Sequence, residues 1–123
     1  MSIAPRVLLG NLEPMVRIGM TTVLGEEGID VVGTEERPQA LLLMAGRLRP
    51  DAVVLDLGHA TSRDLAARVR ARSPETTVVL WARDEEAMEV VVPGASSPRR
   101  VPAPVPADLC GELVSSQVNR VEG

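Results

Sequence analysis

The chain has 123 residues, of which 45% are hydrophobic and 24% charged, and its formal net charge is −4. This length gives room for one hydrophobic core, so we expect a single domain over residues 1–123. All 13 basic residues are arginine, and Trp81 is the only aromatic residue. The lack of lysine excludes Schiff-base chemistry. The negative net charge and the presence of only one aromatic side chain argue against direct contact with nucleic acid.

The N-terminus carries neither a signal-peptide pattern nor a long apolar run. We therefore expect a cytoplasmic protein that does not use a membrane as a partner. Cys110 is the only cysteine, so no disulfide framework forms, and its place in a predicted helix favours a core position. His59 is the only histidine, has no serine or cysteine nucleophile motif beside it, and is expected in an exposed loop. We expect no enzymatic activity.

Prolines, glycines and apolar runs divide the chain into alternating strands and helices. The expected order is strand 6–10, helix 13–24, strand 29–33, helix 38–48, strand 51–57, helix 61–72, strand 76–81, helix 84–91, strand 99–101 and helix 107–121. The strands are continuously apolar rather than alternating, which indicates a sheet buried on both faces. The sequence thus predicts an α/β fold with a doubly wound, five-stranded parallel sheet.

The pattern is weakest between the fourth helix and the fifth strand. Helix 84–91 is predicted because its first turn would hold three acidic residues, Asp84, Glu85 and Glu86, near the positive end of the helix dipole. The segment 93–106 is rich in proline, so the fifth strand must be short, and the order of this segment stays open.

In open parallel sheets, functional residues gather just beyond the carboxyl ends of the strands. Six residues occupy such positions here, namely Asn11, Leu12, Glu13, Asp56, Trp81 and Val101.

Three segments, 6–17, 51–57 and 72–80, resemble response-regulator receiver domains. The likeness is closest to the subfamily with a C-terminal helix-turn-helix, and it spans about residues 5 to 115. It implies a flavodoxin-like topology with a phosphoacceptor at Asp56. It also implies a Mg²⁺-binding acidic pair at Asn11 and Leu12, a hydroxyl residue at Trp81 and a lysine near Val101.

The chain departs from the family at each of these positions except Asp56. Asn11 and Leu12 lack the charge that Mg²⁺ prefers, so we expect no metal and no cofactor. Trp81 is expected to plug the pocket, to face a partner as an anchor, or to belong to the core. No lysine replaces Val101. Phosphoryl transfer depends on positioned charge, so the pocket formed by these residues is expected to be degenerate.

Other readings of the pocket remain open. Glu13 precedes Pro14 and is expected to be exposed at a helix start, although its carboxylate could turn toward Asp56. Arg99 or Arg100 could supply the missing positive charge. Asp56 is then either a vestigial phosphoacceptor held by hydrogen bonds or a residue that senses something through other contacts.

We expect an atypical receiver domain that acts without phosphorylation, through a protein partner, to control a transcription regulator. The partner is a second copy or a related regulator, and the effector domain is absent from this chain. Two alternatives are a working phosphoacceptor that uses Asp56 with rearranged ligands and a sensor of a small ligand. Candidate interface residues are the acidic run Asp84, Glu85 and Glu86 and the basic pair Arg99 and Arg100.

Overall fold

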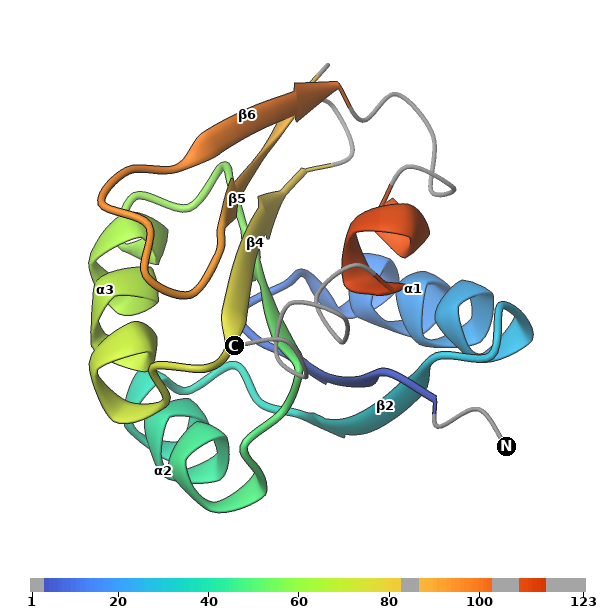
Figure 1. The fold of residues 1–123 in the computed structure, drawn as a ribbon. Helices are drawn as coiled ribbons and strands as arrows, with labels where there is room; N and C mark the ends of the chain where they lie inside the picture. Colours follow the sequence, from blue (N-terminus) through green and yellow to red (C-terminus); the bar gives the residue numbers. More distant parts are fainter. Residues whose placement is uncertain (1–3, 83–86, 103–108, 115–123) are drawn as a thin grey trace.

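The computed structural model describes residues 4–82, 87–102 and 109–114 (Figure 1). The elements are β1 (Arg6–Leu9), α1 (Pro14–Glu26), β2 (Asp30–Thr34), α2 (Pro38–Leu48), β3 (Ala52–Asp56), α3 (Ser62–Arg72), β4 (Thr77–Trp81), β5 (Ala87–Val91) and β6 (Arg99–Pro102). Residues 109–114 are also helical. An α/β fold with alternating strands and helices is therefore confirmed up to β4.

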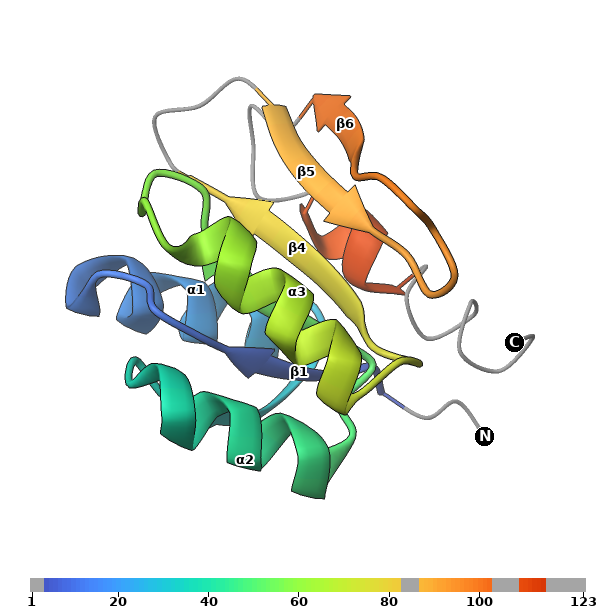
Figure 2. The same ribbon diagram turned by 90° about the vertical axis from the view of Figure 1, so that its left-hand side faces the viewer.

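The six strands form one sheet in the order β2-β1-β3-β4-β5-β6. The pairs β1–β2, β1–β3 and β3–β4 are parallel, whereas β4–β5 and β5–β6 are antiparallel. The prediction of a purely parallel, five-stranded sheet is therefore wrong for the C-terminal part of the chain. Figure 2 shows β5 and β6 continuing the sheet beyond β4.

The predicted helix 84–91 is wrong over 87–91, because these residues form β5. Their side chains alternate along the strand, with Met88 and Val90 buried and Glu89 between them half-buried. Only five residues, 82–86, separate Trp81 from Ala87. A connection this short fits an antiparallel neighbour and is too short for the helical crossover that a parallel strand needs. The acidic residues 84–86 themselves lie outside the described part of the chain.

The predicted strand 99–101 exists as β6, but it pairs antiparallel with β5 at the edge of the sheet. Of the predicted helix 107–121, the described residues 109–114 are helical. Of the proline-rich segment, residues 93–98 form turns and bends between β5 and β6, while 103–106 lie outside the described residues.

Helices cover both faces of the sheet (Figures 1 and 2). One face packs against α2 and α3 in a cluster that includes Leu41 and Val69. The other packs against α1 and residues 109–114 in a cluster that includes Leu24 and Leu113. The central strand β3 contributes Val54 to the cluster beneath α1, and Val53 and Leu55 to the cluster beneath α2 and α3. The first four residues of β3 are fully buried. This two-sided burial explains the continuous apolar run of that strand.

Candidate functional site

The carboxyl ends of β1 and β3 meet at Asn11 and Asp56. The Asn11 side-chain oxygen accepts a hydrogen bond from the backbone N–H of Asp56 at 3.0 Å. Its amide nitrogen donates to the hydroxyl of Ser62 at 3.0 Å, and Ser62 is the fully buried first residue of α3. The Asn11 amide therefore joins β1, β3 and α3, and both of its polar atoms are used in doing so.

Gly10 allows β1 to approach β3 closely just before this cluster. Its N–H donates to the Val54 carbonyl oxygen at 2.8 Å. A Cβ atom on Gly10 would lie 2.4 Å from Leu55 Cδ2 and 3.2 Å from the Val54 oxygen. The missing side chain at this position is what sets Asn11 beside the end of β3.

The Asp56 carboxylate is half-buried at the end of β3, and its Oδ1 accepts the backbone N–H of Gly58 at 2.8 Å. The chain then turns back toward α3, because the Asp56 carbonyl oxygen accepts the N–H of His59 at 3.2 Å. His59 is exposed, as the sequence indicates, and its Nδ1 accepts the N–H of Thr61 at 3.2 Å. Asp56 thus stabilises its own loop with both backbone and side chain.

The two residues that follow Asn11 have other environments. Leu12 is 3% exposed and belongs to the core cluster beneath α1. Glu13 is exposed at the N-cap of α1, where its side chain makes no capping hydrogen bond and its carbonyl oxygen accepts the N–H of Arg17. The carbon side chain of Leu12 therefore occupies core space at a position where the resemblance implies a metal-binding carboxylate.

Trp81 is the register partner of Asp56 at the end of β4. Its side chain is half-buried and packs against the cluster that also contains Leu109 and Leu113, in the helical residues 109–114. Its indole Nε1 is buried and has no hydrogen-bond partner within the described residues. An indole in this position supplies bulk and an apolar surface beside the strand end, where a hydroxyl would have supplied a small donor.

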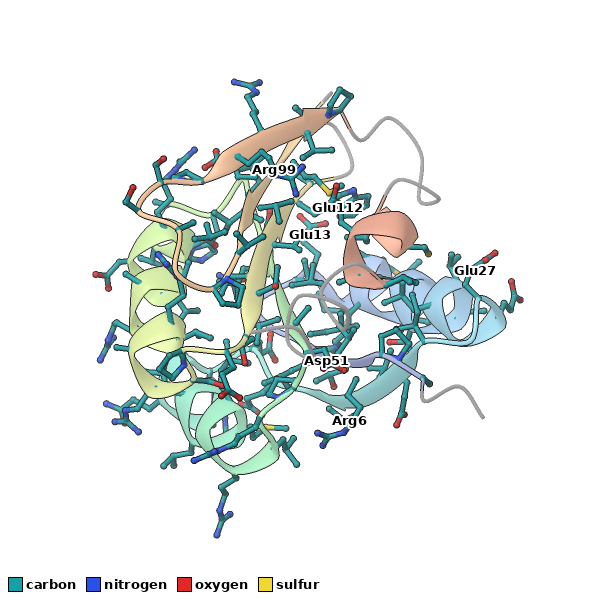
Figure 3. The ribbon with its side chains drawn as sticks, in the orientation of Figure 1. Arg6, Glu13, Glu27, Asp51, Arg99 and Glu112 are labelled. Carbon is teal, nitrogen blue, oxygen red and sulfur yellow. The ribbon has the colours of Figure 1, made fainter. Side chains whose placement is uncertain are left out.

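Val101 does not join this cluster. It lies on β6 opposite Met88, and β5 separates it from β4. Arg99 forms an ion pair with Glu112 at 3.0 Å, so its charge is directed toward residues 109–114 (Figure 3). Arg100 instead lines a cavity of about 230 Å³ with Leu57, Arg63, Ala87 and Glu89. Within that cavity Arg63 and Glu89 form an ion pair.

Sequence reasoning missed two features of this region. The sequence places Ser62 only at the start of a predicted helix, whereas in the structure its hydroxyl is the second partner of Asn11. The sequence pattern predicts Glu89 in a helix, whereas the structure places it on β5, where it forms an ion pair with Arg63. The β-branched run at 90–92 was the available signal for that strand.

Cys110 lies in the core, as its sequence position indicates. Burial raises the pKa of its thiol, and the negative charge of Glu27 adds to this shift. The thiol is therefore neutral at physiological pH, and a low-pKa nucleophile is not formed here.

Within residues 4–82, 87–102 and 109–114, no three histidine, cysteine, aspartate or glutamate side chains gather where they could hold a metal ion. Each helix in the same ranges is too short or too polar to cross a lipid bilayer. No protein-family model, no curated protein and no solved structure matches the chain. The fold and the contacts described above are thus the basis for any functional proposal.

Proposed function

We propose that the chain is an atypical receiver domain that works without phosphorylation and acts by association with a second copy or a related regulator. The order β2-β1-β3-β4 with Asp56 at the end of β3 supports the receiver part of this proposal. In such a sheet the carboxyl edge is where a receiver would hold its phosphoryl group. The control of a transcription regulator through this association is part of the same proposal.

The observation that carries the proposal is the use of the Asn11 amide. A Mg²⁺-dependent phosphoacceptor needs free oxygen ligands beside the aspartate. Here the oxygen of Asn11 accepts the Asp56 N–H and its nitrogen donates to Ser62. Leu12 is in the core, and no lysine exists in the sequence. These observations support the proposal that the residues around Asp56 stabilise the fold and do not carry out phosphoryl transfer.

The test is the intact mass of the chain after incubation with acetyl phosphate and Mg²⁺. We expect no change in mass, while an ordinary receiver domain treated in parallel gains a phosphoryl group. A gain that disappears in Asp56→Ala would support the alternative of a working phosphoacceptor and would reject the proposal. Association that is unchanged by Asp56→Ala, measured by sedimentation velocity at several concentrations, is the second expected result.

A further inference from the structure

Two buried polar side-chain atoms on β4 have no hydrogen-bond partner within residues 4–82, 87–102 and 109–114. They are the hydroxyl oxygen of Thr77, at the start of the strand, and the indole nitrogen of Trp81, at its end. Thr77 is 1% exposed, so water does not reach its hydroxyl from the surface. Buried polar groups in folded proteins are nearly always bonded, and two unpaired groups on one strand therefore require a physical explanation.

The buried hydroxyls just before β4 are paired. Those of Ser73 and Thr76 share a hydrogen bond of 2.6 Å, and Thr76 also donates to the carbonyl oxygen of Pro50 at 2.8 Å. Thr76 and Thr77 are thus neighbouring threonines that are each 1% exposed, but only Thr76 has partners.

Both unpaired atoms belong to side chains on the same face of the sheet. Along β4, Val78 and Leu80 belong to the cluster beneath α2 and α3. Val79 belongs to the cluster on the opposite face, and Trp81 packs against that cluster. Because side chains alternate along a strand, Thr77 shares the face of Val79 and Trp81. This is the face that α1 and the last helical segment cover (Figure 1).

Of these two helical segments, α1 is attached to the sheet at both ends. Residues 10–13 join it to β1, and residues 27–29 join it to β2. Leu12 and Ile29, one in each connection, are 3% exposed and belong to the core. Separation of α1 would therefore also disturb two strands.

Residues 109–114, which we call the cover helix, are attached differently. Three of its six residues are buried, while Val114 is 47% exposed. Glu112 forms an ion pair with Arg99 of β6, whose side chain is 55% exposed, so solvent weakens this contact. Within the described part of the chain no strand follows the cover helix. It can leave the sheet without breaking a strand pair.

We propose that the cover helix separates from the sheet as a unit while the rest of the domain stays folded. The buried apolar side chains of the cover helix favour the docked state. The unpaired atoms of Thr77 and Trp81 oppose it, because water can bond both of them once the helix has left. Cooperative opening of one element below the energy of global unfolding is a general property of folded proteins.

Such an opening gives the domain a second conformation that requires no phosphoryl group. The inference goes beyond the proposed function and does not depend on it, since it concerns the docking of one helix within a single chain.

The first experiment uses Cys110, which lies on the cover helix and is 8% exposed. Its labelling by a thiol reagent is followed in the full chain, without denaturant and in increasing urea. The reference is Ala45→Cys in a Cys110→Ser chain, because residue 45 is fully buried on α2 beneath the other face. Relative to the rate in each unfolded chain, Cys110 should be labelled at least about tenfold faster and should respond less to urea.

The two neighbouring threonines supply a matched pair of variants. Thr77→Val keeps the shape of the side chain and removes the unpaired hydroxyl, so it should slow the labelling of Cys110 by about fivefold or more. Thr76→Val removes a bonded hydroxyl at the same burial. It should lower the melting temperature but leave the labelling of Cys110 unchanged, because the bonds of Thr76 persist when only the cover helix opens.

Hydrogen exchange followed by mass spectrometry identifies the element that moves. The amides of residues 109–114 should exchange at the opening rate that Cys110 reports, and those of α1 at least about tenfold more slowly. Equal exchange of the two helices would overturn the proposal. It would equally be overturned if Cys110 were labelled no faster than the cysteine at position 45, or if Thr77→Val left the labelling of Cys110 unchanged.

Discussion

The side-chain oxygen of Asn11 lies 3.0 Å from the backbone nitrogen of Asp56, and this hydrogen bond joins the ends of two neighbouring parallel strands. The same amide reaches the buried hydroxyl of Ser62. Asparagine suits this position because it both accepts and donates. Asn11, which lacks the charge expected of a metal ligand, thus connects β1, β3 and α3 through its side-chain hydrogen bonds.

We predict that Asn11→Ala destabilises the chain by about 1–3 kcal/mol, because a partly buried N–H and a buried hydroxyl lose their partner. Urea unfolding followed by circular dichroism measures this loss. Asn11→Asp retains an acceptor for the Asp56 N–H, and the Ser62 hydroxyl can donate to its second oxygen, so its loss should be smaller. Equal stability of the Ala variant and the unmodified chain would contradict the structural role of Asn11.

Gly10→Ala should destabilise the chain by about 1–3 kcal/mol, the usual cost of forcing extra volume into a packed core. The added Cβ atom would contact Leu55, Leu41 and the Val54 oxygen at 2.4 to 3.2 Å. Gly46→Ala, at an open position inside α2, should instead stabilise by about 0.5–1 kcal/mol. Thermal and urea unfolding of the two variants should therefore shift in opposite directions.

Cys110 should react slowly with a thiol reagent in the native state and rapidly once the chain is unfolded. The raised pKa of the buried thiol means that the folded state holds its proton more tightly than the unfolded state. Below the ordinary value of 9.0 this makes no difference to stability, and above it stability should fall as pH rises. Labelling with and without denaturant, with Cys110→Ser as a blank, measures the first effect. Rapid native labelling would show that the thiol is accessible.

Arg37 should control the titration of Glu35. A hydrogen bond from the Arg37 side chain is the main cause that lowers the pKa of Glu35 below its ordinary 4.5. The stabilisation is therefore complete above that value and is lost as pH falls through the lowered pKa. Arg37→Gln should return the pKa of Glu35 toward the ordinary value in a carboxyl-detected NMR titration. Because the Arg37 side chain is 79% exposed, solvent screens the pair and neutral-pH stability should hardly change.

The sequence predicted the first four strands because each has a continuous apolar run, and the first three helices because each has apolar residues at helical spacing between proline, glycine or capping residues. It failed at 87–91 because two rules conflicted there. Acidic residues before Ala87 suggested a helix start, while the valines at 90 and 91 favour a strand. The strand forms because the connection from Trp81 is short and because β4 offers an edge with which residues 87–91 can pair. Both features belong to the tertiary structure.

The candidate site was predictable only in its location. Asp56 and Asn11 were placed at strand ends by the apolar pattern, and the structure brings them together. The role of Ser62 depends on how α3 is oriented, and the displacement of Val101 from Asp56 depends on the inserted strand β5. Neither is encoded in a local pattern of residues.

The final strand of the sheet has a consequence for aggregation. Among the described residues β6 is the edge strand of the sheet, and a sheet edge is a template on which other chains can add strands. Its sequence is Arg99, Arg100, Val101 and Pro102. The proline lacks an N–H to offer an added strand, and the two arginines of one copy would face those of another with like charge. This end of the sheet is therefore protected against growth into fibrils, even where two molecules associate elsewhere.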